Sequence, residues 1–121
     1  MQVSKMHPSN QDGAIRIVCF DSFLLDTKVF IDKIKARGGD VIFIRPPSSG
    51  PLWRGEQMGF PRDKFWDKTL RLTNCKGIHF ADYPETSKFD CPEYSHITKT
   101  DAAIYTKHLV EIIRKDIGWK I

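Results

Sequence analysis

The sequence predicts an α/β fold in which helices cover both faces of a parallel sheet, a three-layer α/β/α sandwich. Short runs rich in β-branched residues alternate along the chain with stretches of helical periodicity, which is the pattern of βαβ units. One of these runs, Val41–Ile44, is apolar at every position, as in a strand buried on both faces. The 121 residues allow one domain with one core, so we expect a sheet of few strands.

The first expected elements are a strand, a helix and a second strand. Residues 1–13 are rich in Ser, Asn, Gln and Gly, which predicts a flexible lead-in to a single domain at residues 14–121. Ala14–Phe20 combines β-branched residues with little polarity and is therefore predicted to be a strand. Apolar residues recur with helical spacing over Thr27–Arg37, and the two glycines that follow end this helix. Val41–Ile44 is the second strand.

A proline-rich segment separates the second strand from the next helix. Residues 45–51 contain three prolines and a glycine, so we expect regular structure to stop there and a long loop to run to Phe60. Pro61 then suits the first turn of a helix that continues over Arg62–Thr73. Gly77–Ala81 is short and mostly apolar, which predicts a third, buried strand.

The last expected helix covers Lys99–Lys115, where apolar residues recur on one face. Thr98 and Asp101 resemble a capping box at its start, with Asp in place of the usual Glu or Gln. The segment before it, Asp82–His96, is expected to be a loop. The elements therefore alternate regularly, and right-handed crossovers would join the three strands.

The composition limits the classes of function. The formal net charge of +4 and the pI near 9.0 come from basic residues interleaved with acids, which is not the pattern of a nucleic-acid-binding face. No apolar run reaches the roughly 18 residues of a bilayer span, and residues 1–13 have no signal-peptide core. We therefore expect a cytoplasmic protein. Three cysteines without CxxC spacing argue against a disulfide framework or a zinc ribbon, and no cofactor is expected.

Function in an open parallel sheet is expected at the carboxyl ends of the strands. In the predicted topology three loops meet at that edge: residues 21–25, 46–60 and 82–97. Trp53 and Asp82 lie in these loops and Arg45 directly precedes the second one, and all three are candidate substrate-binding residues. Arg45 could bind an anionic substrate group or form a salt bridge with Asp82, and Trp53 could line a pocket or a subunit contact. His79, inside the third strand, is expected to be a buried core histidine.

The most informative segment is the loop before the last helix, which carries Glu93 and His96. A short loop at the mouth of a helix can aim an imidazole at a pocket while a carboxylate holds its ring. The two side chains are therefore candidate catalytic residues. Asp90 and Cys91 of the same loop could add metal ligands, but the spacing matches no standard zinc pattern, so no metal is expected.

Several segments of the chain follow one another in a recognisable order: Arg37-Gly38-Gly39, Asp40–Pro47, a Pro-started helix with Trp66, Phe80–Tyr83, and Glu93–His96 before a helix with Asp101-Ala102. In this order the chain from about Val29 to Lys115 resembles the C-terminal half of SGNH/GDSL-type hydrolases, particularly their membrane-associated and acyl-transferring relatives. The resemblance implies a flavodoxin-like fold and a serine esterase. In that family an Asp-x-x-His motif before the last helix supplies two members of a Ser-His-Asp triad. Here Glu93 takes the place of the Asp, and His96 matches the His.

The resemblance also implies a nucleophilic serine just after the first strand, for which Ser22 is the candidate. Phe20 stands where the family has a glycine that bends the backbone toward the oxyanion. Alternatively, residues 1–25 only lead into a truncated domain whose nucleophile segment is missing.

Two functions follow from the sequence. The first is an SGNH-like esterase, or a remnant of one, that acts on a small-molecule or acylated substrate. The second is a non-catalytic interaction or assembly module derived from the same scaffold. A small sheet with open edges also predicts a homodimer or a larger homo-oligomer.

Overall fold

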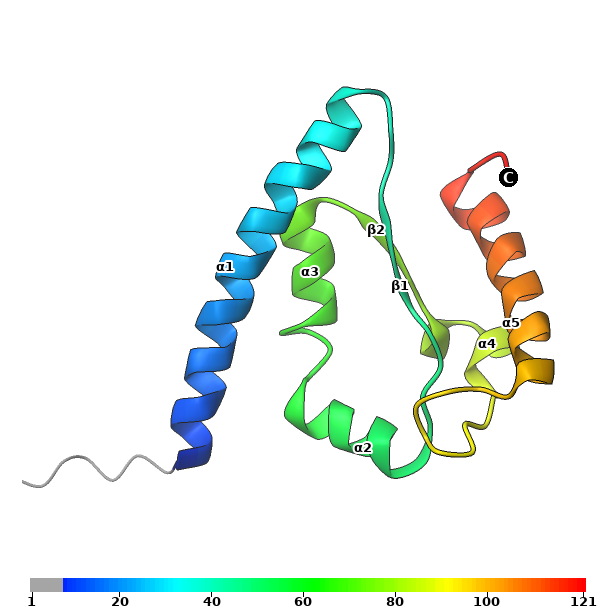
Figure 1. Cartoon of the computed structure of the whole chain (residues 1–121), viewed down its shortest axis with the longest axis horizontal. Helices are drawn as coiled ribbons and strands as arrows, with labels where there is room; N and C mark the ends of the chain where they lie inside the picture. Colours follow the sequence, from blue (N-terminus) through cyan, green and yellow to red (C-terminus); the bar gives the residue numbers. More distant parts are fainter. Residues whose placement is uncertain (1–7) are drawn as a thin grey trace, which may run out of the picture.

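The computed structural model describes residues 8–121, with side chains from residue 19 onward. Most of these residues are helical. The elements in chain order are α1 (Pro8–Ala36), β1 (Ile42–Arg45), α2 (Gly50–Gly59), α3 (Trp66–Thr73), β2 (Lys76–His79), the 3₁₀ turn η1 (Phe80–Asp82), α4 (Pro84–Ser87), α5 (Lys99–Ile112) and the π turn η2 (Ile113–Ile117) (Figure 1).

β1 and β2 form a two-stranded parallel sheet. Ile42 pairs with Lys76 at one end of the sheet, and Arg45 pairs with His79 at the other. Helices α2 and α3 lie in the crossover between the strands, as parallel pairing requires. The prediction of an α/β protein with a parallel sheet is therefore confirmed, and both strands lie within two residues of their predicted ranges.

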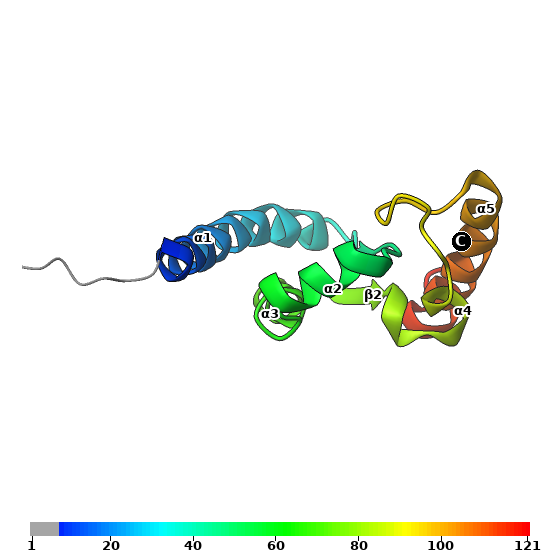
Figure 2. The ribbon, with the colours of Figure 1, turned by 90° about the horizontal axis from the view of Figure 1, so that it is seen from below.

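Helices lie on both sides of this sheet: α1 and α3 on one side and α5 on the other (Figures 1 and 2). On the α5 side, Ile78 packs with Ile112 and Ile113 in a buried cluster. On the α3 side, Gly77 allows the helix to approach closely, because a Cβ there would lie 2.6 Å from Cζ2 of Trp66. Helices thus lie on both sides of the sheet, but the expected burial of the Val41–Ile44 strand on both faces is wrong, because β1 contains no buried residue and Ile44 is 38 % exposed.

The predicted strand at Ala14–Phe20 is wrong, because these residues belong to α1. The helix also takes in residues 8–13 of the expected lead-in, while residues 1–7 lie outside the described part. Strand propensity is a weak preference that packing overrides. Leu24 and Ile31, two turns apart, are buried on one face of α1, which packs on α3.

The expected loop up to Phe60 is also wrong, because Gly50–Gly59 forms α2. Pro51 stands in the first turn of this helix, where its fixed φ and missing N–H are tolerated. The predicted helix at Arg62–Thr73 begins later, at Trp66, and the residues before it form turns. Its end is marked by Asn74 in the left-handed region, with φ of +53°.

The loop expected at Asp82–His96 contains one further turn of helix, α4. The last helix begins at the predicted Lys99, and the Thr98 hydroxyl caps it by accepting the Asp101 N–H at 3.1 Å. None of the helices within residues 8–121 is both long enough and apolar enough to cross a lipid bilayer.

Candidate functional site

The loop before α5 is fastened to the turn that follows β1. The Ser49 N–H donates to the Tyr94 carbonyl at 3.0 Å, and the Cys91 N–H donates to the Ser49 hydroxyl oxygen at 2.9 Å. Gly50, with φ of +59°, passes so close to the Tyr94 ring that a Cβ would lie 2.7 Å from Cδ1. Because β1 ends at Arg45, this docking holds the loop at the carboxyl end of the sheet, as the topology predicted.

Glu93 and His96 form a hydrogen-bonded pair on this loop. Nδ1 of His96 lies 3.0 Å from Oε1 of Glu93, and the Ser95 hydroxyl donates to Oε2 of Glu93 at 2.5 Å. The hydrogen bond from Ser95, and then that from His96, lowers the pKa of the Glu93 carboxyl. An ionised carboxylate beside Nδ1 favours the tautomer that carries its proton there, which leaves the Nε2 lone pair as the proton acceptor. The His96 side chain is 84 % exposed, so the ring is open to an incoming group.

Ser22 does not join this pair within one copy of the chain. It is exposed and lies inside α1, rather than after a strand. Helix α1 packs on α3, and both views place it across the sheet from α5 and the loop that precedes α5 (Figures 1 and 2).

The three predicted substrate-binding residues are divided between two ion pairs and a pocket. Arg45 pairs with Glu56 of α2, so the expected salt bridge between Arg45 and Asp82 is wrong. Asp82 instead accepts two hydrogen bonds from Arg62, at 2.5 and 2.8 Å, and this contact lowers the pKa of its carboxyl. The cause of the error is α2: as a helix, it brings the Glu56 carboxylate to the end of β1.

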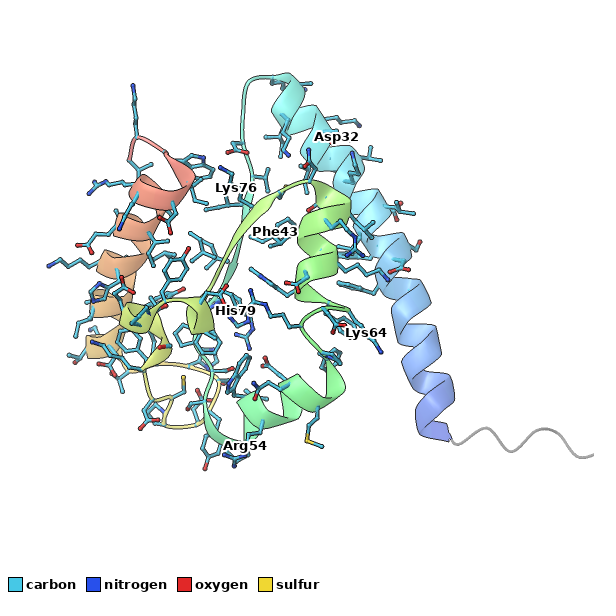
Figure 3. The ribbon with its side chains drawn as sticks, turned by 180° about the vertical axis from the view of Figure 1, so that it is seen from behind. Asp32, Phe43, Arg54, Lys64, Lys76 and His79 are labelled. Atoms are coloured by element: carbon cyan, nitrogen blue, oxygen red, sulfur yellow. The ribbon has the colours of Figure 1, made fainter. Side chains whose placement is uncertain are left out.

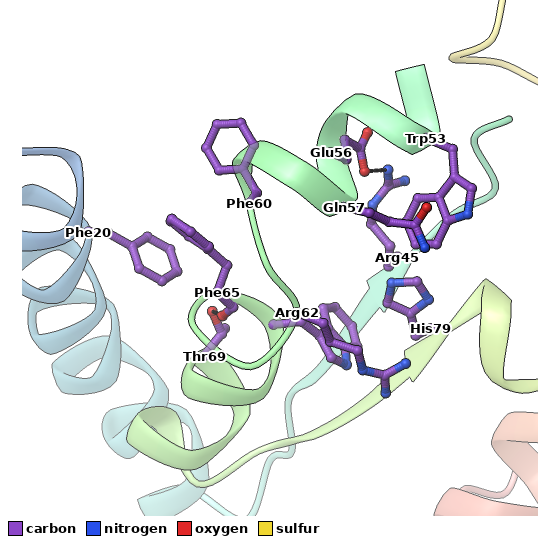
Figure 4. A pocket seen from close by; sticks show the side chains of 11 residues that line it. Phe20, Arg45, Trp53, Glu56, Gln57, Phe60, Arg62, Phe65, Thr69 and His79 are labelled. Atoms are coloured by element: carbon purple, nitrogen blue, oxygen red, sulfur yellow. Dashed lines mark hydrogen bonds and ion pairs between the residues drawn. The ribbon is translucent and has the colours of Figure 1, made fainter. Parts of the chain in front are cut away.

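Arg45 and Trp53 meet at a pocket between α1, α2, α3 and the carboxyl end of the sheet (Figure 4). The pocket has a volume of about 230 Å³ and a mostly apolar lining. Its aromatic side chains are Phe20, Trp53, Phe60, Phe65 and Trp66. Its polar side chains are Arg45, Glu56, Gln57, Arg62, Thr69 and His79. Asp82 is not part of this lining, but it is hydrogen-bonded to Arg62, which is.

His79 is a candidate that the sequence reasoning missed as a functional residue. It is 5 % exposed, which confirms a buried histidine, yet its ring also lines the pocket. Figure 3 shows it at the end of β2, and its ring packs edge-on against Trp66 with 5.3 Å between the ring centroids. The signal that could have found it is its position, since the last residue of a parallel strand lies where ligands bind.

The protonation of His79 follows from its contacts. Nδ1 accepts the Ala81 N–H at 3.1 Å, so the neutral ring carries its proton on Nε2. Burial, and then the Arg62 cation, lowers the pKa of His79 below its ordinary value of 6.5. At neutral pH the ring is therefore an uncharged hydrogen-bond donor.

A second hollow, of about 440 Å³, lies beside the pocket and reaches Ser95 of the loop before α5. It shares Arg45, Glu56 and Phe60 with the pocket, and Ser95 lines its far side. Ser95 is also hydrogen-bonded to Glu93, so this hollow lies next to the Glu93–His96 pair.

Cys91 belongs neither to a metal centre nor to an activated thiol site among the residues that the structure describes. No group of three or more His, Cys, Asp or Glu side chains is placed to hold a metal ion in that part of the chain. Cys91 is buried, and burial raises the pKa of its thiol, which disfavours the nucleophilic thiolate. Its Sγ faces the Pro47 carbonyl at 3.6 Å, a packing role.

Comparisons with protein-family models, with curated proteins and with solved structures gave no match to the chain. The resemblance to SGNH/GDSL-type hydrolases is therefore carried by the residues of the sequence alone.

Proposed function

We propose that the chain carries the histidine–carboxylate half of an SGNH-like serine esterase site. The observation that carries this proposal is the Glu93–His96 pair, with 3.0 Å between Oε1 and Nδ1, held at the carboxyl end of a parallel strand. This is the orientation that a general base needs, because the carboxylate fixes the ring and leaves Nε2 outward.

The reaction would follow the serine-esterase sequence. A serine hydroxyl oxygen bonds to the ester carbonyl carbon while its proton passes to Nε2 of His96. The intermediate expels the alcohol, which takes that proton from His96, and water then repeats both steps to release the acid. Glu93 stays ionised and stabilises the imidazolium that forms in each step.

The nucleophile comes from outside the loop. The hydroxyls of Ser48, Ser49 and Ser95 are engaged with Arg45, the Cys91 backbone and Glu93, respectively. We propose that Ser22 of a second copy supplies the attacking hydroxyl, because Ser22 is exposed and its neighbour Phe23 is 65 % exposed. A homodimer that covers the apolar side chains of α1 would carry Ser22 into an interface.

The flavodoxin-like, three-layer architecture expected from the sequence is part of this proposal. Two parallel strands with open edges and helices on both sides are what remains when a flavodoxin-like, three-layer sandwich is reduced in strand number. A second copy, or further strands, would complete such a sheet. The cytoplasmic location expected from the sequence belongs to the same proposal.

Labelling with a fluorophosphonate probe, followed by mapping of the adduct, tests the esterase. We expect the probe on Ser22, loss of labelling in His96→Ala, and partial loss in Glu93→Gln. A mixture of Ser22→Ala and His96→Ala chains should regain labelling, because one mixed interface pairs an intact serine with an intact histidine. An absence of labelling of the wild-type chain between pH 6 and pH 9 would contradict the proposal.

A non-catalytic assembly module is the second candidate, and a different observation favours it. Phe23, Phe30 and Ile34 form an exposed apolar stripe on α1, and large exposed apolar patches mark protein contacts. If labelling fails while light scattering still finds a dimer that Phe30→Glu dissociates, the assembly module is the better account.

A further inference from the structure

We propose that the pocket between α1, α2, α3 and the carboxyl end of the sheet binds an uncharged molecule with one aromatic ring and a carbonyl oxygen, which accepts a hydrogen bond from Nε2–H of His79. This inference does not rest on the esterase, because neither Glu93 nor His96 lines the pocket.

The size of the pocket sets the size of the ligand. Its volume is about 230 Å³, whereas an apolar cavity of roughly 150 Å³ is enough to hold benzene. One ring and a substituent of two or three heavy atoms therefore fit.

The lining selects an aromatic ligand. Phe65 packs against Phe20 and Phe60 with ring centroids 5.2 and 5.1 Å apart, and Trp53 lies 5.6 Å from the His79 ring. These rings meet at tilted or edge-on angles (Figure 4), the geometry in which a further aromatic ring is also favourable.

The charges around the pocket select an uncharged ligand. Arg45 is matched by Glu56, and Arg62 is matched by Asp82, which it contacts with both terminal nitrogens. With these guanidinium groups already paired, no unmatched cation among them is left to hold an anion. Burying a carboxylate here would leave it without a counter-ion, which is costly.

His79 supplies the polar contact. Its Nδ1 is occupied by the Ala81 N–H, and among the described residues its Nε2 has no recorded hydrogen-bond partner. Since His79 lines the pocket and its Nε2 is not fully buried, the N–H is free to donate to a ligand oxygen in place of water. A carbonyl next to a ring matches one donor beside an aromatic wall.

Three small probes of nearly equal shape test the inference on the wild-type chain: acetophenone, cumene and the benzoate ion. Binding is measured from the chemical shifts of the Trp53 and Trp66 indole N–H groups. We expect acetophenone to bind with a roughly millimolar Kd. Cumene lacks the carbonyl and should bind about five- to tenfold more weakly. Benzoate should bind at least about tenfold more weakly, because its charge is unpaired in the pocket.

His79→Phe removes the donor and keeps a ring, so acetophenone should lose its advantage over cumene. His96→Phe is the matched control, since it changes an exposed histidine outside the pocket, and it should leave all three affinities unchanged. The inference is overturned if benzoate binds more tightly than acetophenone, if acetophenone and cumene bind the wild-type chain equally, or if no probe shifts either indole. The wild-type comparison decides the matter even if His79→Phe does not fold.

Discussion

His96 and His79 both lie at the carboxyl end of the same small sheet, yet their surroundings are opposite. His96 stands on a loop, is 84 % exposed on its side chain, and contacts the Glu93 carboxylate through Nδ1. His79 ends a strand, is 5 % exposed, and contacts a backbone N–H through Nδ1. Nδ1 of His96 is therefore paired with a hydrogen-bond acceptor, whereas Nδ1 of His79 is paired with a donor.

This difference assigns different chemistry to the two rings. A carboxylate at Nδ1 makes Nε2 of His96 a base, whereas a backbone N–H at Nδ1 makes Nε2 of His79 a donor. Proton transfer would then belong to the exposed loop, and ligand binding to the pocket. Arg45 and Ser95 both line the hollow that lies between the two regions.

The largest expected effect is on the rate of fluorophosphonate labelling. His96→Ala should lower this rate on the order of 10²- to 10⁴-fold, because it removes the general base. His79→Phe is the matched substitution in the pocket and should change the rate by less than about threefold, since neither Glu93 nor His96 lines that pocket. Equal losses in both variants would show that the two histidines act as one site.

The next effect concerns the wall of the pocket. Gly77→Ala should lower the free energy of unfolding by about 1–3 kcal/mol, because its Cβ would lie 2.6 Å from Trp66 and 2.7 Å from Leu70. Gly55→Ala is the control on α2: its Cβ meets nothing within 4 Å, and helix propensity predicts a gain of about 0.5–1 kcal/mol. Urea unfolding measures both changes. If Gly77→Ala left the free energy of unfolding unchanged, α3 would not pack closely against the sheet at Gly77.

The sequence predicted the loop better than the pocket, for a physical reason. Glu93 and His96 are three residues apart, so local spacing was enough to bring them together. The pocket takes side chains from α1, α2, α3 and both strands, and its shape depends on how those elements pack.

The secondary structure of two segments that line the pocket was predicted wrongly, so the pocket could not be predicted from the sequence. Ala14–Phe20 has the composition of a strand but forms part of α1, which carries Phe20 to the pocket. Gly50–Gly59 contains four residues that disfavour helices, Gly50, Pro51, Gly55 and Gly59, and nevertheless forms α2, which supplies Trp53 and Glu56. Propensity is weaker than tertiary packing in both places.

A smaller effect is expected at the helix that follows the His96 loop. Thr98→Ala should lower the free energy of unfolding by about 1 kcal/mol, because the Thr98 hydroxyl caps α5. Thr98→Ser keeps the cap and serves as the control in the same urea titration. Binding of acetophenone in the pocket should not change in either variant. This result would show that the start of α5 can be destabilised without a change in the pocket.

The smallest effect is the dependence of stability on pH. The pKa of His79 is lowered in the folded chain, so below about pH 6.5 the unfolded chain takes up the proton first. The contribution of His79 to the free energy of unfolding is therefore fully present above pH 6.5, and it decreases as the pH falls toward the pKa of the folded state. The groups that face the ring are Arg62, Asp82, Arg45 and Glu56, and Asp82 loses its own contribution only below pH 3.8.

Urea unfolding between pH 5 and pH 8 checks this dependence, with His79→Phe as the comparison. The difference in stability between the wild-type chain and the variant should shrink as the pH falls below 6.5. A constant difference would mean that His79 titrates as it does in the unfolded chain.

The tautomers of the two histidines test the account most directly. Long-range proton–nitrogen correlation spectra of the ¹⁵N-labelled protein, recorded above pH 7.5, report which ring nitrogen carries the proton. We expect the proton on Nδ1 in His96 and on Nε2 in His79. The same tautomer in both rings, or a proton on Nε2 of His96, would contradict the assignment of one ring as a base and the other as a donor.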